Sequence, residues 1–298
     1  MTQRRGEISH AVGGRVAAGI LSWHSDETLE STLGMHREAG FFELFDETVI
    51  HFQEVRDVDI ERAERFGLRW IGSENNRHIG GGFYHLIRHL EADYLFLLED
   101  DLALETSAAK LRDTLVDAIG LLRAGEIDIF MCRRHDMVKR GYTKYHPVRD
   151  FDEESNPPGS TPGFETHGSL YRLGKRLAHP YRAQRAVHKA VWIEKHPEAV
   201  FPRAIRRVPT EHDDIYVVRG RATKWANPGI LAARETFLNV YDHIRRQTPG
   251  FEEYGRSLEE LVNERHRRWW LRQGFRVGFT KPILLRHNRL EDGGKINY

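Results

Sequence analysis

Three consecutive carboxylates, Glu99, Asp100 and Asp101, directly follow the apolar run YLFLL at residues 94–98. A continuous apolar run is typical of a strand buried on both faces. Like charges at the end of such a strand are drawn toward low dielectric, where repulsion raises carboxyl pKa values. A divalent cation relieves that cost, because Mg²⁺ or Mn²⁺ binds one or two carboxylates together with substrate phosphates. The triplet predicts a metal-phosphate site, and the alternative is that these acids cap the next helix or face water.

The elements around the triplet alternate between strand-like and helix-like stretches, which predicts a βαβ sheet. We expect strands at residues 15–23, 47–52, 68–72, 94–98 and 127–132. The carboxyl ends of parallel strands meet at one edge of a sheet, where such folds hold their ligands. Besides the triplet, this edge should gather Ser22, Trp23, His24, Gln53, Glu54, Asn75, Asn76 and Arg77.

The second half of the chain is less regular. Residues 150–166 are rich in Pro, Gly, Ser and acids and predict a long loop, a kind of segment that often covers a functional site. Helices are expected at residues 234–245 and 258–273, and a last strand at 275–285 runs into His287. No linker is visible, so we expect a single domain over residues 1–298.

Composition narrows the function classes only a little. Lys and Arg number 45 against 44 Asp and Glu, so bulk charge does not predict a polyanionic partner. The single cysteine, Cys132, excludes an internal disulfide and a thiolate metal cluster. No run approaches the roughly 20 apolar residues that cross a bilayer, and the first 14 residues have no apolar core of signal-peptide length. We therefore expect a soluble, cytoplasmic protein without a membrane span.

Phosphate-binding glycine loops are missing from their usual places. Gly13 and Gly14 precede the first expected strand, which is the wrong side for a dinucleotide fingerprint. No Walker-type Gly-Lys-Ser/Thr sequence occurs. An ordinary NAD or ATP site is therefore disfavoured.

The segments ILSWHSDETLESTL and SENNRHIGGGFYHLIRHLEADYLFLLEDD resemble the nucleotide-binding half of GT-A fold glycosyltransferases, particularly family 2. The resemblance covers about residues 16–101 well and the remainder loosely. It implies an α/β fold with a Rossmann-like, mostly parallel sheet flanked by helices, and an irregular C-terminal acceptor-binding half. The nucleotide-sugar-binding half would then span about residues 15–133 and the acceptor-side half about 134–298.

The same resemblance implies roles for the residues at the sheet edge. Asp101 would be a direct ligand of Mn²⁺ or Mg²⁺, with Glu99 and the closing His287 completing the metal shell, and Asp100 would contact the ribose or the metal. Ser22, Trp23 and Glu54 would surround the nucleobase and ribose. Asn76, Arg77, Gly80, Gly81 and Gly82 would line the nucleotide cleft, where absent side chains permit close backbone approach. The alternative for the glycines is a flexible turn before a helix.

The catalytic base is less sharply indicated. In the resembling family an acid on or before the late helix often removes the acceptor proton. Glu260 and Glu264 share a helix face by their i,i+4 spacing, and we favour Glu260. The alternative is a solvated helix face that pairs with nearby arginines. The segment at residues 226–229 (ANPG) resembles one that lines the donor-sugar and acceptor site in such enzymes.

A second acidic cluster, residues 211–214 (EHDD), also has metal-binding residue types. It precedes a strand-like stretch at residues 215–218. Carboxylates before a strand lie at the opposite edge from a parallel-sheet site, unless that strand runs antiparallel. We therefore expect this cluster to lie away from the substrate.

These observations predict a metal-dependent glycosyltransferase that takes a nucleoside-diphosphate sugar, with a UDP-sugar favoured and inversion implied by the resemblance. The acceptor stays open among a glycan, a protein, a small molecule and a modified DNA base. One alternative is a nucleic-acid-associated protein of the same fold, which either glycosylates modified DNA bases or binds without catalysis. Its basis is the basic bias of Arg203, Arg206, Arg207, Arg219 and Arg221. A nucleotidyltransferase is a third hypothesis, disfavoured because Ser22 to Ser25 lacks a basic glycine-rich loop.

Overall fold

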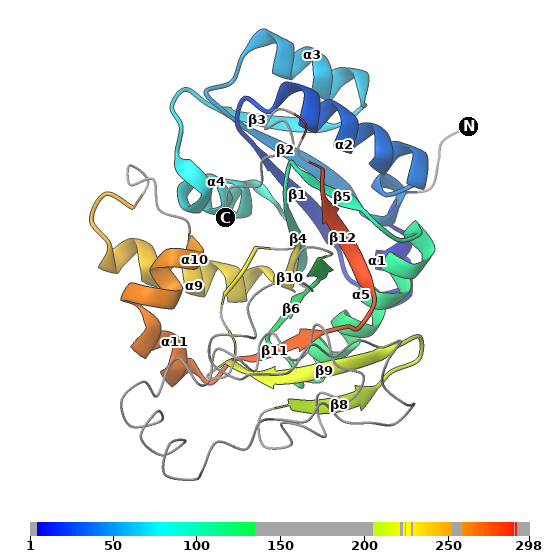
Figure 1. Ribbon diagram of the computed structural model, residues 1–298, viewed down its shortest axis with the longest axis vertical. Coiled ribbons are helices and arrows are strands. Elements are labelled where there is room, and N and C mark those ends of the chain that lie inside the picture. The colour runs from blue at the N-terminus through cyan, green and yellow to red at the C-terminus, as the bar shows by residue number, and fades with distance from the viewer. Residues whose placement is uncertain are drawn as a thin grey trace, which may run out of the picture.

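The computed structural model describes residues 5–134, 205–220, 223, 225–227, 229–251, 258–288 and 290. Within them the main sheet has nine strands in the order β3-β2-β1-β4-β10-β6-β11-β9-β8 (Figure 1). In chain order, the first four strands of this sheet are β1 (Val16–Ser22), β2 (Glu47–Gln53), β3 (Arg69–Ser73) and β4 (Tyr94–Glu99). They pair in parallel.

The remaining strands of this sheet continue from β4. They are β10 (Ile230–Ala233), β6 (Ile129–Met131), β11 (Arg276–Phe279), β9 (Asp214–Arg219) and β8 (Ile205–Pro209). Only β10 and β9 run against the direction of β4. The expected mostly parallel sheet is therefore confirmed.

Helices cover both faces of the sheet. One hydrophobic core packs α4 (His78–His89), α9 (Arg234–Gln247) and α11 (Arg267–Gln273) on the first face. The other core packs α1 (Glu7–Val12), α2 (Asp26–Ala39), α3 (Asp57–Arg65) and α5 (Ala108–Arg123) on the second. Strand β4 shows why its apolar run is continuous, because Leu95 and Leu97 belong to the first core and Phe96 and Leu98 to the second. This layering confirms the expected α/β fold class, with a mostly parallel sheet flanked by helices.

A second, three-stranded sheet has the order β5-β12-β7, with β5 at Leu102–Leu104, β12 at Ile283–His287 and β7 at Arg133–Arg134. Figure 1 shows β12, in red, lying beside β5. The prediction of one strand at residues 275–285 is wrong, because β11 ends at Phe279 and β12 joins the other sheet. Pro282 stands between the two strands, and proline has no N–H for a sheet ladder.

The helix expected at residues 258–273 is also divided. It consists of α10 (Leu258–Glu260), a π-helical turn η4 (Leu261–Arg265) and α11. The helix expected at residues 234–245 is confirmed as α9. No helix in the described ranges is long and apolar enough to cross a membrane. The loop expected at residues 150–166 lies outside the described residues.

Candidate active site

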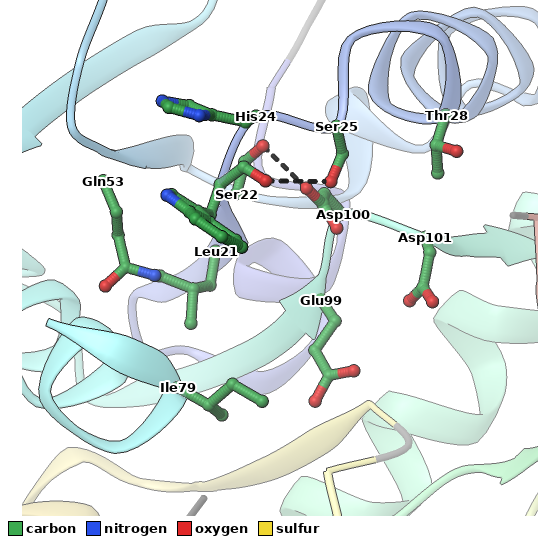
Figure 2. Close-up of a pocket in the computed structure, with 11 residues that line it drawn as sticks. Leu21, Ser22, His24, Ser25, Thr28, Gln53, Ile79, Glu99, Asp100 and Asp101 are labelled. Carbon is green, nitrogen blue, oxygen red and sulfur yellow. Dashed lines mark hydrogen bonds between the residues drawn. The ribbon is translucent and has the colours of Figure 1, made fainter. Parts of the chain in front are cut away.

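A pocket of about 470 Å³ opens at the carboxyl ends of β1, β2 and β4 (Figure 2). This size lies within the range of pockets that hold small molecules and cofactors. Its described lining comprises Leu21, Ser22, Trp23, His24, Ser25, Thr28, Gln53, Ile79, Glu99, Asp100 and Asp101. The edge that the sequence predicts as the site therefore forms one cavity, into which the triplet and the end of β1 project.

Asp100 is held against the end of β1. Its backbone N–H donates to the Leu21 carbonyl at 3.0 Å, and its Oδ2 accepts from Ser22 Oγ at 2.7 Å. Burial, and to a smaller extent the charge of Asp101, raises the pKa of Asp100 to about 6, although the hydrogen bond from Ser22 partly offsets these effects. Figure 2 shows Asp100 pointing toward Ser25, whereas Glu99 and Asp101 extend the other way. The three side chains of the triplet thus leave the end of β4 and the following turn in two directions.

Asp101 lies against the end of β12. Its Oδ2 is 3.0 Å from Nδ1 of His287, and both side chains are less than 10% exposed, at 6% and 9%. The contact is set by register, since His287 pairs with Leu102 in the β12–β5 ladder. A residue 186 positions away in sequence is thereby brought to the acidic strand end.

The donor set fits a hard or borderline divalent cation. Carboxylate oxygen and imidazole nitrogen suit Mn²⁺, and Asp100 adds a carboxyl whose burial cost a cation would relieve. Within the described residues, no group of three or more His, Cys, Asp or Glu side chains is arranged as a complete metal site. Mg²⁺-type sites commonly take only one or two protein carboxylates and complete their shell with substrate phosphates. The arrangement around Asp101 and His287 is of that open kind.

The rim beyond Ser22 presents an exposed aromatic ring. Trp23 is 50% exposed, its Nε1 donates to Glu54 Oε2 at 2.8 Å, and its ring stacks on His24 at 5.4 Å between centroids. His24 and Glu54 both have left-handed backbones, with φ of 52° and 51°. Non-glycine residues adopt this region at a cost and cluster at binding and active sites. The two strand ends therefore hold a flat surface and a carboxylate beside the cavity.

The opposite wall is made by the start of α4. Gln53, which is buried, accepts from the Arg77 backbone N–H at 2.8 Å, and the Asn76 side chain accepts from the His78 N–H at 2.7 Å. These residues fix the entry of the chain into the helix. Neither Asn76 nor Arg77 is among the described residues that line the pocket.

The glycines lie inside α4 rather than in a turn before it. Gly80, Gly81 and Gly82 are all buried in the first turns of the helix. A Cβ on Gly82 would lie 2.6 Å from Leu21 Cδ1 and 3.0 Å from Gln53 Oε1. Gly82 is therefore required for close packing of α4 on β1 and β2, and the same close packing sets the pocket wall.

Neither of the expected catalytic acids is among the described residues that line this cavity. Glu260 is half-buried on α10 and is not part of the described pocket lining. The side chain of Glu264 is outside the described residues. Asn227, from the ANPG segment, is buried and accepts from Trp225 Nε1 at 2.9 Å. Sequence reasoning missed Thr28 and Ile79, because a threonine in a helix and an isoleucine beside glycines carry no distinctive pattern.

No family model matches the chain, and no curated protein matches it. Among solved structures it is similar to a mannosyltransferase from Pyrobaculum calidifontis in complex with GDP-Man and Mn²⁺, with 12% identity over 94% of this chain and 58% of that one (TM-score 0.49). It is also similar to glucosyl-3-phosphoglycerate synthase from Mycobacterium tuberculosis in complex with Mn²⁺, UDP and glucosyl-3-phosphoglycerate, with 14% identity over 96% and 77% of the two chains (TM-score 0.46). A third is S. aureus TarS 1–349, with 9% identity over 92% and 60% (TM-score 0.46). The chain thus spans 58% of the length of the mannosyltransferase chain.

Proposed function

We propose that this protein is a metal-dependent glycosyltransferase that transfers a sugar from a nucleoside-diphosphate donor, with a UDP-sugar favoured. The observation that carries the proposal is the pairing of Asp101 with His287 at 3.0 Å beside a half-buried Asp100, at a pocket of about 470 Å³. A divalent cation bound there would neutralise the charge that develops on the departing diphosphate.

The other residues have distinct roles in this proposal. Trp23 supplies a flat face for the nucleobase and Glu54 a hydrogen-bond acceptor at its edge. Asp100, turned toward β1, accepts from the ribose hydroxyls, and Ser22 keeps its carboxylate oriented. Asp101 and His287 hold the metal, and Glu99 extends on the same side as Asp101.

A single displacement at the anomeric carbon inverts configuration and needs one base to take the acceptor proton. We assign this role to Glu260, with Glu264 as the alternative on the same helical stretch. Both lie on the α10–η4 stretch, which packs beside α9. Catalysis by Glu260 requires that acceptor binding bring its carboxylate to the pocket, and loss of transfer with retained donor hydrolysis in Glu260→Gln would support that role.

Calorimetric titration of UDP tests the central claim. Wild-type protein should bind UDP far more tightly with Mn²⁺ present than after chelation, and Asp101→Ala should bind UDP equally weakly in both conditions. Asp213→Ala, which removes a carboxylate from the second acidic cluster, is the matched control and should behave as wild type. Metal-independent UDP binding that Asp101→Ala leaves unchanged would refute the proposal.

The product released separates the competing enzyme classes. A glycosyltransferase incubated with nucleotide sugars and Mn²⁺ releases a nucleoside diphosphate, whereas a nucleotidyltransferase incubated with a nucleoside triphosphate and a sugar phosphate releases pyrophosphate. A screen of nucleotide sugars for metal-dependent hydrolysis would also identify the donor. DNA retention at low salt that falls steeply as salt rises would favour a DNA-base acceptor instead of the other classes.

A further inference from the structure

One face of α2 carries a row of hydroxyl groups in place of apolar side chains. Thr28, Ser31 and Thr32 stand at helical spacings i, i+3 and i+4, which lie on one face. Thr28 and Thr32 are only 2% and 1% exposed. Buried hydroxyls are costly without partners, so this row must serve another segment of the chain.

The partner is the segment that follows β12. The Asn288 side-chain amide donates to Ser31 Oγ at 3.1 Å and to Thr32 Oγ1 at 3.2 Å. Two residues on, the Leu290 backbone N–H donates to Thr28 Oγ1 at 2.9 Å. All three hydroxyls of the row are therefore acceptors for the end of one strand.

Asn288 also contacts the acidic strand end directly. Its backbone N–H donates to the Asp101 carbonyl at 2.7 Å, and its chain neighbour is His287. The ladder of β12 with β5 ends at the rung between His287 and Leu102. Beyond that rung, in the part of the chain that the structure describes, the end of β12 is held by the Asn288 backbone bond to Asp101 and by the bonds of Asn288 and Leu290 to the α2 hydroxyls.

We propose that Asn288 is a positioning residue, which clamps the end of β12 to α2 so that His287 and Asp101 face one divalent cation. The inference rests on the proposed metal-dependent function and adds a residue that acts through the ligands. Groups that orient metal ligands from behind usually change metal affinity by 10- to 100-fold when they are removed. Thr28 connects the segment after β12 to the proposed nucleotide site, because Thr28 lines the pocket and its hydroxyl accepts from the Leu290 N–H.

The neighbouring residue Arg286 offers a matched control on the same strand. It forms an ion pair with Glu105 at 3.2 Å, and its side chain is 48% exposed. Its loss removes a contact between β12 and the loop after β5 without touching α2 hydroxyls or Asp101. A general weakening of β12 would therefore appear in both Arg286 and Asn288 variants, whereas a positioning effect would appear only at Asn288.

The test is Mn²⁺ binding, followed by the electron paramagnetic resonance signal of free Mn²⁺ with and without UDP, and it does not depend on turnover. Asn288→Ala should weaken Mn²⁺ binding about 10-fold or more, and Arg286→Ala should stay within about twofold of wild type because it leaves the Asn288 bonds in place. The double variant Ser31→Ala/Thr32→Val removes the acceptors from the other side and should produce a similar loss. Combining it with Asn288→Ala should add little, since both changes delete the same bonds.

The outcomes separate this inference from the proposed function. If wild-type protein does not bind Mn²⁺, or binds it equally well after His287→Ala, the proposed function fails and the inference fails with it. If His287→Ala weakens binding and Asn288→Ala matches Arg286→Ala, the inference alone is overturned. If Asn288→Ala does not fold, the α2 double variant decides the matter by the same criterion. Melting temperatures measured alongside identify any variant whose loss of affinity reflects unfolding.

Discussion

The two acidic clusters of this protein, residues 99–101 and 211–214, have similar residue types in different surroundings. The first ends β4, borders a cavity, and has Ser22 and His287 as partners. In the second, Asp213 pairs with Lys110 at 3.0 Å and Asp214 with Arg207 at 2.7 Å. The difference indicates that neighbours, rather than residue types, make an acidic cluster a candidate site.

Strand direction does not explain the difference. The second cluster was expected at the opposite edge unless its strand ran antiparallel, and β9 does run antiparallel to β11. None of the cluster's residues is among those described as lining the pocket, because the cluster folds onto α5 instead. There Asp117 accepts from His212 at 3.0 Å and raises the pKa of that imidazole. The charges of Asp213 and Asp214 are thus paired within the fold.

The largest contrast between the clusters should appear in catalysis. Asp101→Ala should lower metal-dependent donor turnover by roughly 100-fold or more, because loss of a metal ligand removes several kcal/mol of charge stabilisation. Asp213→Ala should change turnover less than about twofold, since Asp213 is not in the described lining of the pocket and the substitution deletes a partly exposed ion pair. Initial rates at saturating Mn²⁺ for both variants measure the contrast. Equal losses in the two variants would show that the clusters are not functionally distinct.

The elements around residues 99–101 could be predicted from the sequence because their strand and helix patterns are regular. Alternating strand-like and helix-like stretches predicted β1 to β4, and the ends of β1, β2 and β4 do supply the pocket lining. The residues expected after β3, Asn75, Asn76 and Arg77, are not among the described residues that line it. The placement of His287 was supported only by family resemblance. Its contact with Asp101 depends on β12 leaving the main sheet to pair with β5, and no local pattern in three-residue β5 predicts that pairing.

The hydroxyl row on α2 was not predictable for a different reason. Thr28 and Thr32 stand beside Leu29 and Leu33 in α2. All four are buried, because the helix packs on the sheet with one side and receives the segment after β12 with another. A partner more than 250 residues away is invisible to helical periodicity.

Replacing Gly82 in α4 and Gly120 in α5 by alanine should change the stability of the protein in opposite directions. Gly82→Ala in α4 places a Cβ 2.6 Å from Leu21 and should destabilise the protein by about 1–3 kcal/mol through overpacking. Gly120→Ala in α5 meets nothing within 4 Å and should stabilise by about 0.5–1 kcal/mol, because alanine favours the helix. Urea unfolding measures both. Donor affinity should fall only in Gly82→Ala, since Leu21 and Gln53 line the pocket.

Equal free energies of unfolding for Gly82→Ala and wild type would contradict this packing. It would mean that Leu21 and Gln53 move aside without cost, and that the pocket wall at the start of α4 is not closely packed.

His36 on α2 and His212 in the second acidic cluster have pKa values shifted in opposite directions, so they should affect stability differently as pH changes. Burial lowers the pKa of His36, on α2, to about 4 from its ordinary 6.5, and its Nε2 contacts the Leu102 carbonyl at 3.0 Å. Between pH 6.5 and 4 the unfolded chain therefore takes up a proton that the folded chain does not. The stability contributed by neutral His36 is complete above pH 6.5 and declines as pH falls, by about 1.4 kcal/mol per unit.

His36→Gln keeps an amide donor for Leu102 but cannot be protonated. The free energy of unfolding of this variant should depend less on pH than that of wild type between pH 6 and 5, by about 1.4 kcal/mol per unit. Buried His51, whose pKa is lowered to about 3, contributes with the same sign in both proteins and cancels in the difference. His212 has a raised pKa, so its contribution is present below pH 6.5 and is lost as pH rises. An unchanged slope in His36→Gln would mean that His36 is hydrated and that α2 is not sealed against β5.

The smallest effect should come from the ion pair of Lys110 with Asp213, which tests whether the second cluster is merely structural. Asp213→Asn keeps an oxygen to accept from the Asp214 N–H, a bond of 2.8 Å, and deletes only the charge. The expected loss is less than about 1 kcal/mol, because Lys110 is 32% exposed and water screens the pair. Urea unfolding of wild type and variant in low and high salt measures it, and the difference should shrink as salt rises. A loss of several kcal/mol that salt does not reduce would place Asp213 in a desolvated environment, and the two acidic clusters would then resemble each other more closely than their partners indicate.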